Sequence, residues 1–439
     1  MSDSRWSRLI PTRRRVVVYL VVILALLLVR VGLDIWAGYH LESVTARLSS
    51  IYKGLDVASL APPPVAKAEN RARVLGAAVA LVVDGDDANQ RGILSRALTE
   101  DRANQDPVTR DASLRRAAAD NRAALLVLDE AESRPKSNWE ITYRDGVRMR
   151  LPSLMDIRNL SRANQAAGLL ELENGNVDEA ARRARLGFVL AGSLAQEPSL
   201  IVQLIRIAVV TDHVRFLRAV LAQGEPAAVS LQALAAAVAY DAANPPAVTG
   251  LIGELKYQSS LFEGLGRGDY GVGWWAAANS APSLGEQWLA WLVRPAVRVA
   301  HARVLDQLHR TVEYARLQPF ERQARGVRLP SDEPQPWWWR KLTMFGTGGL
   351  GRGYLAGDEH RALTMVSATA VALRRFRLER GAYPATLDEL VPAYMARLPV
   401  DPYTGRAPEY KAAGTGFELK VTPPPTSNAA AVLDWKIAR

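Results

Sequence analysis

Cysteine is absent from the 439 residues of this chain, and histidine is scarce, with five residues. The lack of cysteine excludes disulfide bonds, thiolate metal sites and cysteine nucleophiles. A second long apolar run is also missing, because no stretch after the first 40 residues approaches 18 uncharged apolar residues. Since a transmembrane helix needs about 20 apolar residues, we expect a single membrane span.

A concentrated basic stripe with interleaved aromatic residues is missing as well. The net charge of +10 includes the arginines of the N-terminus, and the other basic residues are spread among many acidic ones. This distribution is typical of a solvated surface with some attraction to anionic lipid, whereas nucleic-acid binding needs a focused basic face. We therefore expect membrane lipid among the partners and no nucleic acid.

The N-terminus carries the pattern of a membrane anchor. Residues 1–15 form a basic tail that ends in Arg13, Arg14 and Arg15, and an unbroken apolar run continues to Val29. These 14 apolar residues would rise only about 21 Å as a helix, so we expect the anchor to occupy 16–39. Basic residues favour the cytoplasmic side. The pattern predicts a bacterial inner-membrane protein with a cytoplasmic N-terminus and a periplasmic bulk.

The outer end of the predicted anchor combines charged and aromatic residues. Arg30 and Asp34 are four residues apart on one helix face and can pair, and Arg30 can also extend to the headgroups. Trp36 and Tyr39 are residue types that gather at membrane interfaces. Two alternatives remain open from sequence: a cleaved signal peptide, whose apolar core has this length, and a buried helix of a soluble protein.

Beyond the anchor, the chain is predicted to be mainly α-helical. Residues 40–65 indicate a stalk with a proline spacer, because a proline triplet excludes helix and favours extended geometry. From 66 to 325, apolar residues recur at three- and four-residue spacing, which predicts a body of amphipathic helices. One interruption differs, since Asp145-Gly146 is a two-residue turn signal that predicts a β-hairpin over 141–150.

Small residues between Ala163 and Ala195 predict two antiparallel helices in close contact, with Gly175 in the turn between them. The pattern resembles a helical hairpin of the tetratricopeptide type, in a single clear copy. True solenoids stack three or more such units. We therefore expect stacked helix pairs in the body, and a peptide-binding groove remains an alternative.

Tryptophan is concentrated in two glycine-rich neighbourhoods. Trp274 and Trp275 follow a run of alternating glycines, and Trp337, Trp338 and Trp339 lie in a linker predicted over 326–357. Such clusters beside flexible glycine favour a membrane-interface or partner-binding patch. The alternative is that they cover the helical core or a domain junction.

Two sequence patterns could indicate a cofactor or metal site, but neither has the surrounding residues that such a site needs. Residues 346–351 have the glycine spacing of a dinucleotide loop, but no strand precedes them and no acidic ribose partner follows, so we interpret them as a linker. Asp306, His309 and Glu313 share one helical face, where interleaved arginines favour a salt-bridge surface over a metal site. We therefore predict no metal, no cofactor and no catalytic residue.

The C-terminal part has the most specific pattern. A helix that ends at Gly381 precedes Tyr383-Pro384, a short leucine-rich helix and an Asp401-Pro402 turn closed by Gly405, and two short strands follow. This order, over about 360–422, resembles the globular head of the major pseudopilin of type II secretion. The resemblance implies a small α+β head at 358–422, followed by a tail at 423–439.

The chain departs from that family at three points. Arg13-Arg14-Arg15 stands where a prepilin has its cleavage motif, about 320 residues separate anchor and head, and the late calcium loop is missing. We therefore expect neither calcium binding nor filament assembly. The whole layout is similar to membrane-anchored bacterial proteins that carry such a head.

The expected function is a non-catalytic scaffold or adaptor that docks envelope or secretion-system components. Two alternatives remain from sequence. One is an envelope hydrolase acting on glycan or peptide, using acids such as Glu254, Glu263, Asp269 or Glu313, with two carboxylates about 5–9 Å apart. The other is an accessory structural subunit of a larger membrane complex. The sequence does not indicate an oligomeric state.

Overall fold

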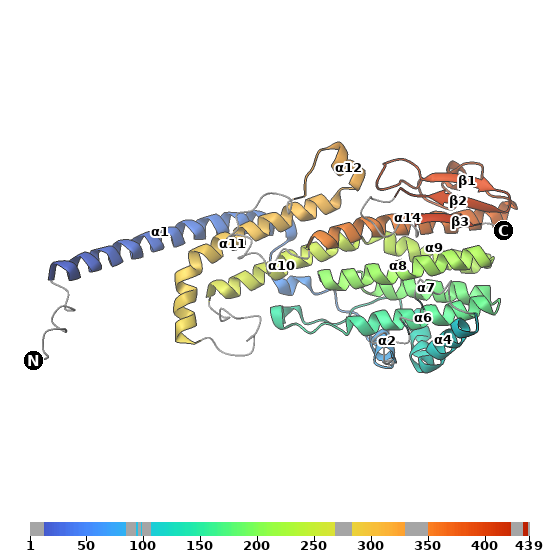
Figure 1. Cartoon of the computed structure of the whole chain (residues 1–439), viewed down its shortest axis with the longest axis horizontal. Helices are drawn as coiled ribbons and strands as arrows, with labels where there is room; N and C mark the ends of the chain where they lie inside the picture. Colours follow the sequence, from blue (N-terminus) through green and yellow to red (C-terminus); the bar gives the residue numbers. More distant parts are fainter. Residues whose placement is uncertain are drawn as a thin grey trace, which may run out of the picture.

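The computed structural model describes residues 13–84, 94, 98, 107–267, 283–329, 350–422 and 433–437. Long helices dominate these residues, and a small sheet lies near the C-terminus (Figure 1). The N-terminal helix projects beyond the other elements, at the end of the molecule opposite the sheet (Figure 1). The predicted mainly α architecture with one long apolar helix is confirmed.

Helix α1 (Arg13–Tyr52) is a single element of 40 residues. Its apolar part is long enough to cross a membrane, and only 6% of the most apolar window is buried. The second half differs, because Val44, Leu48 and Tyr52 are buried against other helices. One continuous helix therefore serves both as an apolar projection and as a core element, so the predicted stalk is not a separate unit.

The body consists of helices that run largely along the long axis of the molecule (Figure 1). Their order is η1 (Val57–Leu60), α2 (Arg71–Val79), α4 (Pro107–Asp120), α5 (Arg122–Glu130), η3 (Ala131–Ser133), η4 (Tyr143–Arg148), α6 (Leu154–Glu173), α7 (Val177–Ser193), α8 (Leu200–Gln223), α9 (Ala228–Ala243), α10 (Pro246–Arg267), α11 (Leu284–Arg316), α12 (Pro319–Ala324) and α14 (Leu350–Arg380).

The predicted hairpin of close-packed helices is formed by α6 and α7. Gly175, in the turn, has a φ of +82°, a conformation that glycine adopts without strain. A Cβ atom at Gly168 would lie 2.4 Å from Cζ of Phe216 in α8. Glycine there allows α8 to approach this helix pair, a contact that the small-residue pattern does not predict. The predicted contact with α7 is also present, because the same Cβ would lie 2.8 Å from Arg183 Cβ.

Two large apolar cores and one small cluster, around Val57 and Tyr143, hold the described elements together. The larger one combines residues of α2 and α4–α9 with those of α14 and the C-terminal sheet. The smaller of the two cores joins α1 to α10 and α11 around Leu48, Leu251 and Leu305. Because Leu373, Phe417 and Trp435 belong to the larger core, the C-terminal head shares its interior with the helical body.

The predicted β-hairpin at 141–150 is wrong. This segment contains the 3₁₀ helix η4, with Gly146 at φ +54°. Ile141 and Tyr143 both pack inward, and the Tyr143 hydroxyl donates a hydrogen bond to Glu197 over 2.7 Å. Burial of these side chains against the body, together with the Tyr143–Glu197 hydrogen bond, outweighs the local turn preference.

The C-terminal head follows the predicted order up to residue 422. Helix α14 ends before Gly381, which has a φ of +77°, and Thr386 and Glu389 form a capping box around η6 (Leu387–Leu390). Strands β1 (Glu409–Ala413) and β2 (Gly416–Lys420) pair antiparallel. The Asp401–Gly405 turn is closed by a hydrogen bond from Gly405 N to Asp401 O over 2.9 Å.

The predicted C-terminal tail at 423–439 is partly wrong, because it supplies a third strand. Strand β3 (Asp434–Ile437) pairs antiparallel with β2, and Trp435 lies fully buried opposite Leu419. The alternation of Leu433, Trp435 and Ile437 is the sequence signal for this strand. The predicted linker at 326–357 also ends earlier, since α14 begins at Leu350.

Candidate functional site

The junction between α1 and α11 is built around one buried carboxylate. Asp34 is 6% exposed and interacts with Arg30, four residues earlier, over 3.6 Å. This confirms the predicted pair, but two further cations from α11 share the same carboxylate. Arg298 Nη1 lies 3.1 Å from Asp34 Oδ1, and Arg294 donates to both carboxylate oxygens. The four residues fix α1 to α11 where α1 leaves the body.

The other predicted interface residues of α1 remain on its surface. Trp36 and Tyr39 are 59% and 71% exposed, and Trp36 stacks on His40. Arg13 and Arg14 are exposed in the first turn, which Arg15 also occupies. The side of α1 that carries Trp36 and Tyr39 is therefore exposed, whereas the Asp34 side is buried against α11.

A cavity of about 660 Å³ lies beside this junction, between α1, α10 and α11. His301 lines it, stacks on Phe262 and is only 2% exposed. Burial lowers the pKa of His301 to about 4, so the imidazole is neutral at pH 7. Its Nε2 atom has no hydrogen-bond partner among the described residues. His301 is therefore a neutral polar group between the Phe262 ring and the arginines of the junction.

A lateral groove of about 540 Å³ opens on another part of the body. Its walls come from the proline spacer, the segment before Asn138, and helices α7 and α9. Apolar and small side chains form most of the lining, and three cations are added to them: Arg71, Lys136 and Arg185. Gly192 brings α7 close to Tyr240 of α9, since a Cβ there would lie 3.1 Å from the ring.

Two buried asparagines set the shape of this groove. Asn70 is fully buried, and its side chain caps α2 and hydrogen bonds the Asn138 backbone in both directions, at 2.8 and 3.0 Å. Asn138 Nδ2 in turn donates to Pro63 O over 2.9 Å. The proline spacer is therefore held on the body as one wall of the groove, and does not form the separate spacer predicted from sequence.

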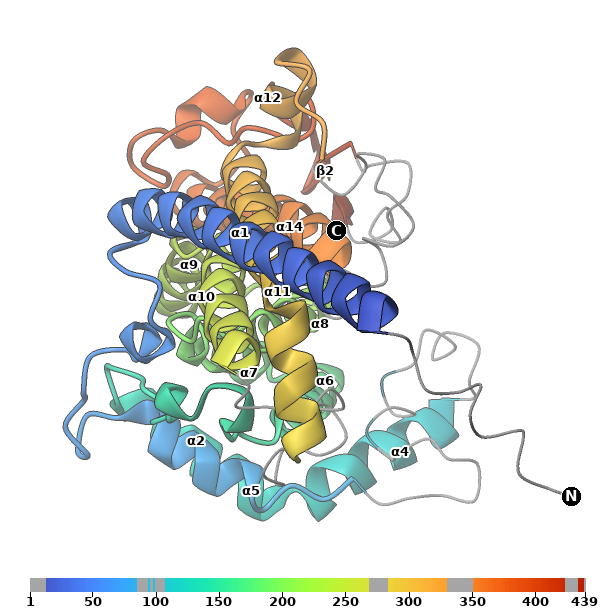
Figure 2. The same cartoon turned by 90° about the vertical axis from the view of Figure 1, so that its left-hand side faces the viewer.

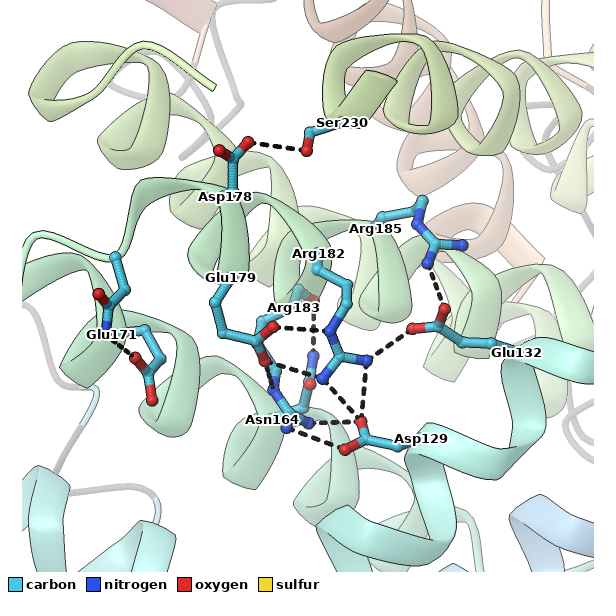
Figure 3. Close-up of polar contacts among 11 residues, drawn as sticks. Asp129, Glu132, Asn164, Glu171, Asp178, Glu179, Arg182, Arg183, Arg185 and Ser230 are labelled. Atoms are coloured by element: carbon cyan, nitrogen blue, oxygen red, sulfur yellow. Dashed lines mark hydrogen bonds and ion pairs between the residues drawn. The ribbon is translucent and has the colours of Figure 1, made fainter. Parts of the chain in front are cut away.

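A charged cluster supports the opposite wall (Figure 3). Arg182 of α7 bridges Asp129, Glu132 and Glu179 at 2.8 to 3.1 Å. Arg185, also on α7, interacts with Glu132 and lines the groove. Burial opposes ionisation of Glu179, but its hydrogen bonds to Arg182 and Arg183 outweigh burial and lower its pKa. The cluster therefore holds α5 and η3 firmly against α7.

Arg71 differs from the other two cations in the groove. Lys136 pairs with Glu69 over 2.9 Å, and Arg185 pairs with Glu132. Arg71 donates its Nε proton to Ala131 O over 3.2 Å, and no described carboxylate lies within ion-pair distance of it. Burial lowers the pKa of the Arg71 guanidinium. An incoming carboxylate would give this cation the ion-pair partner that the described residues do not supply.

The acids considered for a hydrolase are not brought together. Glu254 and Glu263 lie nine residues apart on α10, which separates them by about 13 Å along the axis. Burial raises the pKa of Glu254, which accepts a hydrogen bond from Gln258. Glu313 pairs with Arg316 on the surface of α11. Asp269, the fourth acid, lies outside the described residues.

The candidate metal-binding face of α11 is a salt-bridge surface, as the interleaved arginines predict. Asp306 pairs with Arg47 over 2.8 Å and with Arg310 over 3.2 Å. His309 Nδ1 lies 2.9 Å from the Tyr52 hydroxyl. Across the described part of the chain, no group of three or more potential ligands is close enough to hold a metal ion.

The tryptophan clusters at Trp274, Trp275, Trp337, Trp338 and Trp339 lie outside the described residues, as do residues 346–349 of the glycine-rich pattern. Comparisons with family models, curated proteins and solved structures find no match to this chain. The pseudopilin resemblance of the head therefore remains a prediction.

Sequence reasoning did not find the lateral groove. Its cations are separated by 114 residues along the chain, from Arg71 to Arg185. Tertiary contacts bring their segments together, such as Asn70 with Asn138 and Arg185 with Glu132. A weak local signal exists, because Asn70 stands directly before an amphipathic helix as an N-cap residue. No such signal indicates that its amide also binds Asn138.

Proposed function

We propose that this protein is a membrane-anchored scaffold, and that it docks an acidic segment of another envelope component in its lateral groove. The N-terminal arginines favour a cytoplasmic start of the chain, which would put the body on the outer side. The observation that carries the docking proposal is Arg71, a part-buried cation in the groove without a carboxylate partner among the described residues.

The groove matches the chemistry of such a segment. Arginine presents planar donors that suit a carboxylate, and Lys136 and Arg185 add positive charge at the same walls. Pro62 and Val65 add apolar surface that aliphatic side chains can contact. Tyr240 is 47% exposed and offers a flat aromatic contact. An extended peptide with alternating acidic and apolar residues therefore fits best.

The continuity of the anchor helix with the core supports a scaffold that holds its partner at a fixed position. Helix α1 passes without a break from its apolar projection into the core, so a docked segment would be held at a set position relative to the bilayer. Signal-peptide cleavage near Ala37 would remove Asp34 and leave Arg294 and Arg298 without their shared carboxylate. We therefore infer that α1 is retained in the mature protein.

Photocrosslinking in native membranes tests the docking proposal. A photoreactive residue at Tyr240 should trap one discrete partner, and Arg71→Met should lower the yield about tenfold, as expected for loss of a charge-assisted contact. The same probe at Leu126, an exposed apolar position on α5, is the matched control. Equal products from both positions, or a yield at Tyr240 that Arg71→Met does not change, would contradict the proposal.

A further inference from the structure

The first turns of α11 form an exposed amphipathic segment. Leu284–Val293 is ten residues long and begins with a capping box, in which Ser283 Oγ accepts from Glu286 N and Glu286 accepts from Ser283 N. One half of the helix circumference carries exposed apolar side chains. Their exposed fractions range from 40% to 77%, for Leu284, Trp288, Leu289, Leu292 and Val293.

The other half of this segment faces the anchor. Arg30 of α1 lies over the Trp291 ring at 3.8 Å and donates to the Trp291 carbonyl. One turn further, Arg294 binds Asp34. At 100° per residue, the midpoint of Trp291 and Arg294 lies about 160° around the helix from that of Leu289 and Leu292. Trp288 lies at the border between the two halves, where its ring packs on Trp291 with centroids 5.8 Å apart. The exposed apolar half is thus fixed in orientation relative to α1.

The direction of the segment also sets it apart from the rest of α11. Both views show the first turns of α11 turning away from the line of α1, while the remainder of α11 packs along it (Figure 1 and Figure 2). Pro295 lies inside α11 just after the segment. A proline removes one backbone hydrogen bond and clashes with the preceding turn, which accounts for the change in direction.

The depth of the segment follows from the length of the anchor. From Val16 to Arg30, α1 rises about 21 Å, so a hydrocarbon layer of about 30 Å that starts at Val16 ends about 9 Å beyond Arg30. Helices that lie in a membrane interface bury their apolar face about 5–10 Å below the headgroup boundary. A segment attached to Arg30 therefore sits at interfacial depth.

We propose that Leu284–Val293 is an interfacial helix that lies in the outer leaflet and inserts Trp288 and Leu292 among the lipid acyl chains. This inference rests on the proposed anchor, with whose lipid-facing surface the segment is continuous. Trp291 and Arg294 would hold the segment to α1, while Glu286 and Gln287 stay at the headgroup level. The body would then have two fixed contacts with the membrane, which prevents it from tilting about α1.

Depth-dependent fluorescence quenching tests this proposal on the full chain. Because the chain contains no cysteine, single-cysteine variants carry one probe each. Variants Leu24→Cys, Trp288→Cys, Leu292→Cys and Val229→Cys are labelled with an environment-sensitive dye in nanodiscs of phosphatidylethanolamine and phosphatidylglycerol. Quenchers are attached to the lipid chains either near the headgroup or near the chain end.

The expected result is that probes at 288 and 292 are quenched at least about twofold more than the probe at Val229, and most strongly by the shallow quencher. The probe at Leu24 should respond most to the deep quencher. Quenching at Leu24 without quenching at 288 and 292 would overturn the interfacial helix and leave the anchor intact. If the probe at 292 shows blue-shifted emission but is not quenched, its apolar surroundings are protein and not lipid. That result would also contradict the proposal. Absence of quenching at Leu24 would overturn the anchor and this proposal together.

Discussion

Gly168 is a position at which α6 packs closely against α7 and α8. A Cβ atom there would lie 2.4 Å from Phe216 Cζ and 2.8 Å from Arg183 Cβ. Gly168→Ala should therefore destabilise the protein by about 1–3 kcal/mol through overpacking. Gly76→Ala is the matched control, because that helical glycine has nothing within 4 Å of its Cβ position. The control should stabilise by about 0.5–1 kcal/mol, as alanine does in a helix.

Chemical unfolding in detergent micelles measures both changes. Loss of stability in both variants by the same amount would contradict the close approach of α6 to α8. The sequence supports this prediction in part, since the run of small residues around Gly168 indicates helix contact. It does not identify Phe216 as the contacting side chain, because that residue lies 48 positions further along the chain.

His301 makes the stability depend on pH. The folded pKa is about 4, below the ordinary value of about 6.5, because burial disfavours the imidazolium ion. The unfolded chain therefore binds more protons between these two values, and stability falls as the pH is lowered through that window. For this residue alone, the loss between pH 7 and pH 5 should be about 2 kcal/mol.

Thermal unfolding at pH 7 and pH 5 compares the native protein with His301→Gln, whose side chain stays neutral. The variant should lose about 2 kcal/mol less stability between the two pH values. His40→Gln is the control, because it removes an exposed imidazole on α1. If the stability of the native protein and that of His301→Gln depend on pH in the same way, His301 is not buried in its neutral form.

At the scale of elements, the junction of α1 with α11 depends on Asp34. Asp34→Ala would leave Arg30, Arg294 and Arg298 close together without their carboxylate, which should cost about 3–5 kcal/mol, as for other broken buried pairs. Asp306→Ala breaks an exposed pair with Arg47 between the same two helices, and should cost less than about 1 kcal/mol.

Hydrogen exchange localises the first effect. In Asp34→Ala, backbone amides at the start of α11 should exchange faster, because Arg294 no longer holds that part of the helix to α1. Unchanged exchange there, or equal destabilisation by Asp34→Ala and Asp306→Ala, would show that the carboxylate does not fix the junction. The sequence predicts the Arg30–Asp34 pair from i,i+4 spacing, but not the two arginines that lie about 260 residues further on.

The elements that sequence patterns predict best are those with local signals. The sequence predicts that the long helix of the head ends at Gly381, and the structure confirms this end. The 141–150 hairpin fails because the burial of Tyr143 against Glu197 is a tertiary effect. Strand β3 is missed because it stands beyond a proline-rich stretch, although Leu433, Trp435 and Ile437 alternate as strand residues do.

At the scale of the whole molecule, one helix connects an apolar projection, long enough to cross a membrane, with the junction and the core. Helix α1 contributes apolar surface outside the body and Val44, Leu48 and Tyr52 inside it. The head and the helical body share a second core, so the described elements form a connected structure. Overall class and anchor follow from hydrophobic patterning, whereas the groove depends on contacts such as Asn70–Asn138 that join distant segments.

The topology of this anchor is the central claim, and cysteine accessibility in intact cells tests it most directly. A membrane-impermeant maleimide is applied to the variants Ala413→Cys, at the exposed end of β1, and Ser2→Cys, in the basic tail. We predict that position 413 is labelled once the outer membrane is permeable, and that position 2 is labelled only after the inner membrane is opened. Labelling of position 2 but not of position 413 in intact inner membranes would place the body in the cytoplasm and contradict the account.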